Sequence, residues 1–362
     1  MTIANKAAAR HEPPLIIEAT RNEVSESRHL VDAVAVDATG AVMACWGDAE
    51  RAIFPRSAIK CLQALPLVAS GAADAFGLGD AHLALACASH SSEPAHVDTV
   101  RRWLARLDLT VADLECGAHW PRDPDMGRAL AAAGGVPDNA FNNCSGKHAG
   151  MLTLARHRGW DHHGYVGIGH PVQQEIFTTI SAIADVDLLK APYGVDGCSA
   201  PNPVLPMKNI ALAFARFAAA GANDGQAMAG LDAPLAAACG RLARATAAEP
   251  FMIAGSNRLC TAIVEASRGR ILAKTGAEGV YTLAVPERRL GLVLKVRDGA
   301  ARAANVAVIA IMESLELMDD GLRAALRDFL PEKLRNCRDI VTGEIRPVKS
   351  ADITESEGKA ES

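Results

Sequence analysis

The sequence lacks the features that mark proteins of membranes, of nucleic-acid complexes and of secretion. No apolar run in its 362 residues approaches the ~20 residues needed to cross a bilayer, and its first residues lack the long apolar segment of a signal peptide. Its 37 Lys and Arg are scattered and are outnumbered by 42 Asp and Glu, so no basic region offers a site for phosphate backbones. We therefore expect a cytoplasmic protein that binds neither nucleic acid nor a membrane.

Cysteine pairs of the CxxC type are absent too, which argues against a thioredoxin-type site and against a zinc ribbon. The nine cysteines are an odd number and are spread through apolar segments, as reduced thiols in a protein core usually are. Any metal site built from them must bring together residues that are distant in the sequence.

The pattern of apolar residues predicts strands near both ends of the chain and helices between them. The expected strands are residues 15–20, 29–36 and 41–46, and later residues 263–267, 270–275, 279–285 and 290–296. The expected helices are one that starts near Ser57 and residues 93–107, 171–184, 208–220, 233–247 and 302–317. This order predicts an α+β fold in which both chain ends build one mixed or antiparallel sheet, with a helical lobe inserted at about residues 57–250.

The two ends of the chain, residues 1–13 and 346–362, are polar and uneven, which predicts disordered tails. Hydrophobic residues make up 49% of the chain, enough to bury a large core, and no internal repeat divides it. We therefore expect residues 14–345 to form a single domain.

Two short motifs could carry chemistry: Ser57 and Lys60 form an SxxK pair, and Lys274 opens a KTG tripeptide. A hydroxyl and an amine three residues apart lie on the same face of a helix, so the amine can take the hydroxyl proton if its charge is suppressed. A lone SxxK is common, and its ordinary explanation is a solvated helix face. The rarer KTG falls where β-lactamases and penicillin-binding proteins carry it, so together the motifs favour a serine amidohydrolase of serine β-lactamase-like fold.

The two lysines can form one acid–base system. Lys60 can act as a base only if it is neutral near pH 7, and both burial and a nearby positive charge would lower its pKa. We expect Lys274 to supply that charge while it stays protonated.

A serine-rich segment, Cys87-Ala88-Ser89-His90-Ser91-Ser92-Glu93-Pro94, ends an apolar stretch. Ser91 or Ser92 suits the N-cap of a helix that has Pro94 in its first turn. Ser89 is better placed to face a cleft and pass a proton to a nitrogen leaving group, and His90 either supports the loop or takes part in the site.

Two further loops combine thiols with polar groups. One spans residues 141–150 and contains Cys144, Lys147 and His148, and the other spans residues 194–201 and contains Asp196 and Cys198. On residue chemistry alone, the two cysteines are more simply explained as small core residues. A zinc site is the alternative, since zinc takes two thiolates with a nitrogen or water, although lysine is an unusual ligand.

Five motifs in this order resemble the asparaginase II family, the rhizobial-type or class 3 L-asparaginases. The resemblance spans about residues 14–330 and rests on Arg56-Ser57-Ala58-Ile59-Lys60, Ser89-His90-Ser91, Cys144-Ser145-Gly146-Lys147-His148, Asp196-Gly197-Cys198 and Lys274-Thr275-Gly276. It implies a serine β-lactamase-like fold, a homodimer and the hydrolysis of L-asparagine to L-aspartate and ammonia.

The resemblance also assigns roles to individual residues. Ser57 matches the nucleophile, Lys60 its base, and Ser89 with Lys274 the second Ser/Lys pair. It implies that Cys144, Lys147 and Cys198 hold one zinc ion, with water as the fourth ligand. With the resemblance, a zinc site becomes the preferred explanation of the two cysteines over a place in the core.

The substrate's charged ends need partners as well. Arg56 is a candidate for the α-carboxylate because its guanidinium can bind a carboxylate with two parallel hydrogen bonds, Asp196 is a candidate for the α-amino group, and His148 is a third substrate-binding candidate. Two alternatives remain at this point. One is another serine β-lactamase-like hydrolase that acts on glutamine, a β-lactam or a peptide, and the other is a non-catalytic, zinc-stabilised amino-acid-binding protein.

Overall fold

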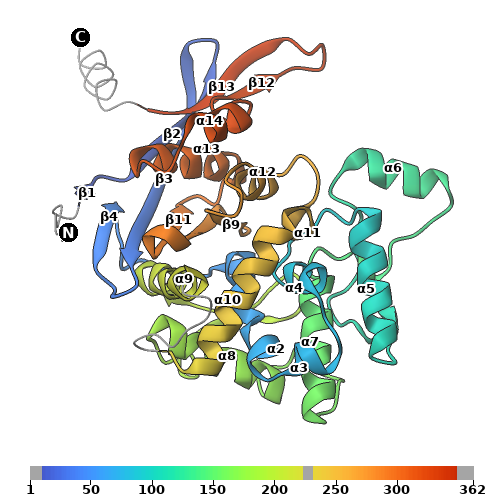
Figure 1. Ribbon diagram of the computed structural model, residues 1–362. Helices are drawn as coiled ribbons and strands as arrows, with labels where there is room; N and C mark the ends of the chain where they lie inside the picture. The colour runs from blue at the N-terminus through green and yellow to red at the C-terminus, as the bar shows by residue number, and fades with distance from the viewer. Residues whose placement is uncertain (1–9, 223–230, 349–362) are drawn as a thin grey trace.

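Strands from both ends of the chain form one sheet, as the sequence predicts (Figure 1). The structure is a computed structural model and describes residues 10–222 and 231–348. The sheet order is β12 (Glu332–Arg335), β13 (Val341–Pro347), β2 (Leu15–Arg21), β3 (Val24–Asp37), β11 (Leu290–Val296), β10 (Val280–Val285) and β9 (Leu272–Thr275), with antiparallel neighbours throughout. β4 (Val42–Trp46) pairs antiparallel with β3, and β1 (Arg10–Glu12) pairs parallel with β4. The fold is therefore α+β with a mixed, mainly antiparallel sheet.

β3 joins the two ends of the chain because it is 14 residues long. Its first half, from Val24 to Val31, pairs with β2, and its second half, from Val31 to Asp37, pairs with β11. Its residues 31–36 are buried, which explains their nearly continuous apolar sequence. The C-terminal strands that carry the KTG tripeptide are thereby fixed to the N-terminal strands.

The inserted helical lobe lies below the sheet in Figure 1. Its helices are α1 (Lys60–Gln63), α2 (Leu65–Ala69), α3 (Ala72–Ala75), α4 (Asp80–Ala86), α5 (Pro94–Arg106), α6 (Pro124–Ala132), α7 (Ser145–Arg158), α8 (Pro171–Ala184), α9 (Met207–Ala222), α10 (Ala233–Ala248) and α11 (Pro250–Ala254). The same part of the chain contains the short 3-10 helices η1 (Arg56–Ile59), η2 (Val111–Asp113) and η3 (Asn139–Phe141) and two small two-stranded sheets, β5 (Ala52–Ile53) with β8 (Leu205–Pro206) and β6 (Tyr193–Val195) with β7 (Pro201–Pro203). A fourth 3-10 helix, η4 (Pro286–Arg288), joins β10 to β11 of the main sheet.

Helices attach to the sheet through close contacts with β11. α9 packs against β3, β10 and β11, and α13 (Ala301–Ser314) packs against β2, β11 and β13. A side chain at Gly291 of β11 would lie 2.0 Å from the carbonyl oxygen of Ala211, so only glycine lets α9 come this close. The core accordingly continues from the sheet into the helical lobe.

Two sequence predictions of local structure are wrong. Residues 263–267, predicted as a strand, belong mostly to helix α12 (Leu259–Ala266), because a short apolar run does not distinguish a buried strand from a buried helix. Residues 10–12 and 346–347, predicted to be in tails, lie in β1 and β13, where backbone pairing orders polar residues. The rest of the predicted N-terminal tail, residues 1–9, and residues 349–362 lie outside the described residues.

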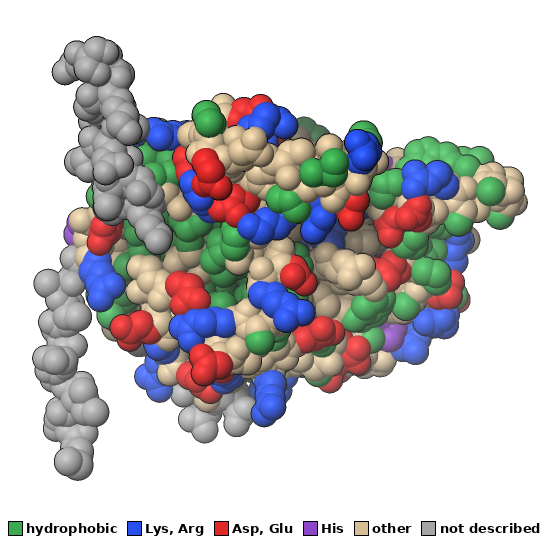
Figure 2. Space-filling model, turned by 90° about the horizontal axis from the view of Figure 1, so that it is seen from above, with side chains coloured by type: hydrophobic (Ala, Val, Ile, Leu, Met, Phe, Trp, Pro, Cys, Tyr) green, Lys and Arg blue, Asp and Glu red, His purple; other side chains and the backbone are tan. Residues whose placement is uncertain are grey.

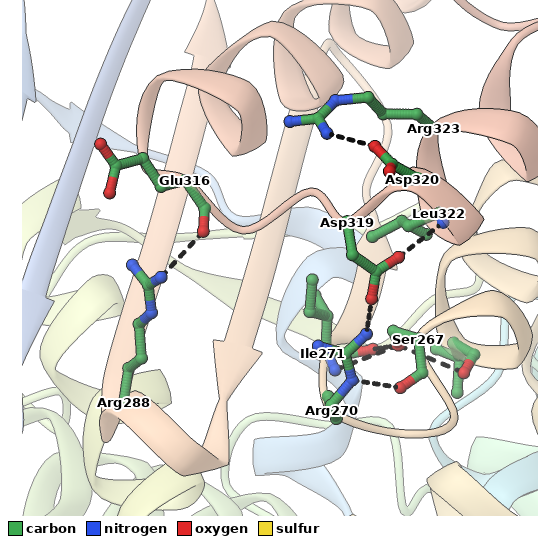
Figure 3. A network of polar contacts seen from close by, with 10 residues as sticks. Ser267, Arg270, Ile271, Arg288, Glu316, Asp319, Asp320, Leu322 and Arg323 are labelled. Carbon is green, nitrogen blue, oxygen red and sulfur yellow. Dashed lines mark hydrogen bonds and ion pairs between the residues drawn. The ribbon is translucent and has the colours of Figure 1, made fainter.

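A network of polar contacts braces the turn that leads into β9 (Figure 3). Asp319 caps α14 (Asp320–Leu326) by accepting from the Leu322 N–H at 2.8 Å, and its other oxygen pairs with Arg270. Arg270 in turn donates to the carbonyl oxygen of Ser267 at 3.1 Å. The turn before Lys274 is therefore tied to the C-terminal helices.

Two features of the described residues concern charge and hydropathy. Positive and negative side chains are interspersed over the face shown in Figure 2, with no large patch of basic residues there. Within residues 10–222 and 231–348, no helix combines the length and the apolar character that crossing a bilayer requires.

Candidate active site

A cavity of about 500 Å³ collects residues from five of the sequence motifs. Its predicted members are Arg56, Ser57, Ser89, Cys144, Asp196, Cys198, and Thr275 with Gly276 of the KTG tripeptide. They come from η1, from the loops that follow α4 and precede α7, from the loop between β6 and β7, and from the end of β9. Segments more than 200 residues apart in the chain thus meet at one site.

Ser57 lies in η1, directly before α1 begins at Lys60. Arg56, the preceding residue, has a φ of 53°, a left-handed conformation that is strained for a side chain of this size. Ser57 Oγ has no hydrogen-bond partner within the described chain and borders the cavity. A hydroxyl that is held in a tight turn and left open to a cavity is suited to act as a nucleophile.

The glycine of the KTG tripeptide lets β9 approach this turn. A Cβ atom at Gly276 would lie 2.9 Å from the Pro55 carbonyl oxygen and 3.1 Å from the Ala58 nitrogen. Thr282 of β10 reinforces the contact, because its hydroxyl donates to the Ala58 carbonyl oxygen at 3.1 Å. The strand that carries Lys274 is therefore packed directly against the backbone that carries Ser57.

Both lysines are buried and meet at the hydroxyl of Ser89. Lys274 Nζ lies 2.8 Å from Ser89 Oγ and donates to the Thr275 carbonyl oxygen at 2.7 Å. Lys60 Nζ lies 3.1 Å from the same Ser89 Oγ and also donates to the carbonyl oxygens of Ala88 and Asn143. Lys60 thus has three acceptors, the number that an ammonium group can satisfy, and no hydrogen bond to Ser57 within the described chain.

The pKa values of the pair differ from the sequence-based expectation. Burial, and next the charge of Lys60, lower the pKa of Lys274 to about 7. Lys274 was expected to stay protonated, whereas in the structure it is the lysine that loses its proton near neutrality.

The loop around Ser89 is held by its neighbours. His90 bonds to Ser145 Oγ at 2.9 Å, so it connects this loop to the start of α7 and has a supporting role. The expectation that Ser91 or Ser92 caps α5 is wrong, because Glu93 is the N-cap residue. The hydroxyls of Ser91 and Ser92 instead donate to the carbonyl oxygens of Ala254 and Phe141.

Cys144, Lys147 and Cys198 form a second buried cluster beside the cavity. Lys147 Nζ lies 3.1 Å from Cys198 Sγ. The hydrogen bond between the two thiols raises the pKa of Cys144 to about 12 and lowers that of Cys198 to about 4, so the pair holds one proton and one thiolate. Burial opposes the charge of Lys147, but the two neighbouring thiols outweigh it and raise its pKa.

The donor set of this cluster, two sulfurs and one amine nitrogen, is of the kind that zinc takes. Lys147 Nζ and Cys198 Sγ lie 3.1 Å apart, a hydrogen-bond distance that is shorter than the about 3.6 Å between a nitrogen and a sulfur bound to tetrahedral zinc. Gly146 permits the arrangement, because a Cβ there would lie 2.3 Å from the Leu85 carbonyl oxygen and push the start of α7 away from α4. A second group of side chains that could hold a metal ion, Asp113, His162 and His163, lies near the surface, and the sequence does not reveal it because Asp113 is 49 residues away from His162 along the chain.

Arg56 and Asp196 bind one another. Arg56 Nε and Nη2 lie 2.8 and 2.7 Å from Asp196 Oδ1. Although burial opposes its ionisation, the charges of Lys147 and Arg56 lower the pKa of Asp196. Asp196 thus occupies two donor atoms of the Arg56 guanidinium, so the contact of Arg56 with the substrate stays a prediction, whereas Asp196 Oδ2 keeps capacity to accept.

His148 is buried behind the cavity and does not line it. Its Nδ1 bonds to the Tyr165 hydroxyl at 2.7 Å, and burial, followed by the charge of Lys147, lowers its pKa to about 3. This side chain faces Tyr165, and the contact of His148 with the substrate stays a prediction.

Two arginines in the cavity wall, Arg122 and Arg258, were not predicted. Arg122 lies between η2 and α6, and Arg258 is the N-cap residue of α12. No pattern in the sequence distinguishes them from the other arginines of the chain, since neither belongs to a motif.

A sequence model of L-asparaginase II matches residues 17–347. The chain belongs to the L-asparaginase II family. Membership of this family supports an amidohydrolase of the asparaginase type. A comparison with curated protein sequences gives no match.

Similar solved structures include several of a protein called Mglu. Its native form is 15% identical, with a TM-score of 0.42 over 80% of this chain and 65% of that one. Its L-glutamate binding form in 4.3 M NaCl is 16% identical, with a TM-score of 0.41 over 80% of this chain and 62% of that one. The chain thus spans somewhat less than two thirds of the length of these structures.

Proposed function

We propose that the protein is an L-asparaginase that hydrolyses L-asparagine to L-aspartate and ammonia through an aspartyl ester on Ser57. The observation that supports this best is the position of Ser57 Oγ, which has no partner in the described chain and borders a cavity beside two buried lysines that share Ser89. Family membership supports the amide substrate. A serine β-lactamase-like fold and a homodimer, both implied by the sequence motifs, belong to the same proposal.

In the proposed mechanism Ser89 passes protons between the two lysines. At a pH above about 7, Lys274 is neutral and accepts the Ser89 proton, while Ser89 takes a proton from the Lys60 ammonium. Lys60 then becomes a neutral amine next to the turn that holds Ser57, and it takes the Ser57 proton as Oγ attacks the side-chain carbonyl carbon. The pair therefore acts as one base although neither lysine is neutral all the time.

Collapse of the tetrahedral intermediate breaks the bond to nitrogen. The proton for the departing ammonia comes from the Lys274 ammonium through Ser89, whose hydroxyl borders the cavity. A water molecule, deprotonated by the same lysine pair, then attacks the ester, and Ser57 regains its proton. Aspartate is released and the site returns to its starting charge.

Asp196 is the proposed partner of the substrate's α-amino group. Arg56 holds it through Oδ1, so Oδ2 is oriented and stays available for an ammonium group. Cys144, Lys147 and Cys198 would hold zinc next to this carboxylate, where the ion would supply positive charge that orients the substrate. The nucleophile in this proposal is the serine, which makes a metal-activated water unnecessary.

Ammonia release measured with L-asparagine, L-glutamine and a chromogenic cephalosporin tests the proposal. We expect turnover of L-asparagine by the wild-type protein and none by Ser57→Ala. Turnover of glutamine or the cephalosporin alone would indicate one of the other serine hydrolases. Tight amino-acid binding without turnover of any of the three would indicate a non-catalytic binding protein and would overturn the proposal.

A further inference from the structure

The cavity wall carries more positive than negative charge. Four arginines line it, Arg56, Arg122, Arg258 and Arg302, against two carboxyl groups, Asp196 and Glu332. Arg56 is paired with Asp196. Arg302 is anchored to the far side of the wall, where it donates to His29 Nε2 at 3.1 Å and to Ser27 Oγ at 2.8 Å.

Arg258 and Arg122 have fewer partners in the part of the chain that the structure describes. Arg258 donates to one neutral acceptor, Ser91 Oγ, at 3.2 Å, and within residues 10–222 and 231–348 neither arginine forms an ion pair. Arg122 is an exposed residue at the cavity, and desolvation of its guanidinium, followed by the like charge of Arg258, lowers its pKa. Two guanidinium groups that repel one another in a cavity are stabilised when an anion binds between them.

Arg258 is also close to the reacting groups. Its charge is one of those that lower the pKa of Lys274, and its neighbours Leu259 and Cys260 line the same cavity at the start of α12. The N–H groups of the first turn of this eight-residue helix add positive potential on the same side of the cavity. An anion at Arg258 would therefore be held within reach of a substrate amide placed at Ser57.

We propose that Arg258, supported by Arg122, binds the α-carboxylate of the substrate, which requires that the substrate be an amino-acid amide as proposed above. In asparagine this carboxylate is three bonds from the carbon that Ser57 attacks. Arg56 is already paired with Asp196, so the two charged groups on the substrate's α-carbon are recognised by different residues, the α-amino group by Asp196 and the α-carboxylate by Arg258. The same subsite would hold the α-carboxylate of the product aspartate.

A substrate analogue that lacks only this group provides the test. 3-Aminopropanamide is asparagine without its α-carboxylate. We expect Arg258→Gln to lower kcat/KM for L-asparagine about 100-fold, mostly through KM, because a charge-assisted pair of hydrogen bonds is lost. For 3-aminopropanamide the same variant should change kcat/KM less than about threefold, since that substrate never made the contact.

Matched variants define the outcome further. Arg258→Lys keeps the charge but loses the bidentate geometry, so we expect it to lower kcat/KM for L-asparagine about tenfold. Arg122→Gln should lower kcat/KM less than Arg258→Gln does. Arg101→Gln, which removes a surface partner of Asp138, is the control and should have no effect. Melting temperatures of all variants report whether each still folds.

An equal fall for both substrates, or a change below about threefold for asparagine in Arg258→Gln, would overturn the subsite. Calorimetric measurement of L-aspartate binding distinguishes a failure of the subsite proposal from a failure of the proposed function. If the wild-type protein releases no ammonia but binds L-aspartate in a way that Arg258→Gln abolishes, the subsite is right and the asparaginase proposal is wrong. If Arg258→Gln binds L-aspartate as the wild type does, the subsite is wrong whatever the activity.

Discussion

Two buried lysines near the same cavity, Lys274 and Lys147, have opposite pKa shifts. Both are deeply buried, yet the pKa of Lys274 falls to about 7 while that of Lys147 rises. Lys274 has Lys60 as its nearest charge, whereas Lys147 has the thiols of Cys198 and Cys144. Burial opposes the charge of both, so the sign of the neighbouring charge decides which lysine is neutral.

The difference separates two kinds of chemistry. A lysine that is neutral near pH 7 can take and return protons, which suits Lys274 for catalysis. A lysine that stays protonated beside a thiolate is an ion-pair partner, and it can become a metal ligand only when a cation displaces its proton. The predictions below test this contrast, starting with the largest expected effect.

The Ser/Lys cluster should be indispensable for turnover. We expect Ser57→Ala to lower kcat by at least about 10⁴-fold, and Lys60→Met and Lys274→Met by about 10³-fold each, because all belong to one reacting unit. The double lysine variant should lose little more than either single variant. Lys208→Met, at an exposed position paired with Glu50, serves as the control in the ammonia assay. Additive losses would show that the two lysines act independently.

The Cys/Lys cluster should govern metal content. Freshly purified protein should contain about one zinc ion per chain at this site, and the Cys144→Ser/Cys198→Ser variant should lose it, because thiolates select zinc over magnesium or calcium. Elemental analysis measures this, with Cys337→Ser, an exposed cysteine, as the control. Measuring the zinc content of His163→Ala as well shows how much of the metal is bound by Asp113, His162 and His163 at the surface. An unchanged zinc content in the double cysteine variant would show that Cys144 and Cys198 are core residues and not zinc ligands.

Zinc binding should also release protons. Cys144 and Lys147 both carry a proton near neutrality, whereas Cys198 is already a thiolate, so binding should release about two protons per ion. Calorimetry in two buffers of different ionisation enthalpy measures the number. Release of no protons would contradict the raised pKa of Lys147.

The pH dependence should report the lysine pair. Because the active form has lost one proton, kcat/KM should rise about tenfold per pH unit below the pKa of about 7 for Lys274, and level off above it. Activity should fall again at more alkaline pH, when the pair loses its remaining proton. Arg258→Gln removes a positive charge that lowers this pKa, so it should move the rise to higher pH, whereas Arg101→Gln should not. A rate that is flat from mildly acid pH upward would contradict a lysine base.

The smallest effects should come from the two glycines that bring backbone segments together at the clusters. Gly146→Ala and Gly276→Ala each place a methyl group against a carbonyl oxygen, which should destabilise the fold by about 1–3 kcal/mol and lower Tm by several degrees. Gly276→Ala should lower kcat as well, since it displaces the Ser57 turn. Gly127→Ala, with open space around it in α6, is the control and should leave Tm equal or slightly higher.

Much of the fold could be predicted because its signals are local. The strands β2, β3, β4, β10 and β11 and the helices α5, α8, α9, α10 and α13 follow apolar patterns that the sequence displays directly. Residues 10–12 and 341–347 were not recognised as strands because pairing with distant strands orders them, which no local pattern records. Helix α12 was predicted as a strand for a different reason, because its short apolar run suits either structure.

The sequence by itself determined which residues meet at the candidate site. The spacing of Ser57 and Lys60, the serine at Ser89, the KTG tripeptide and the two cysteine loops all name residues that the structure brings to one cavity or beside it. Only the tertiary structure decided what each group faces. It lowers the pKa of Lys274 and pairs Asp196 with Arg56. It also places His148 against Tyr165 and leaves Arg258 without an ionic partner within the described chain. The reason is that motifs follow from local spacing, whereas charge, hydrogen bonding and burial depend on neighbours far away along the chain, such as Ser89 and Lys274, which are 185 residues apart.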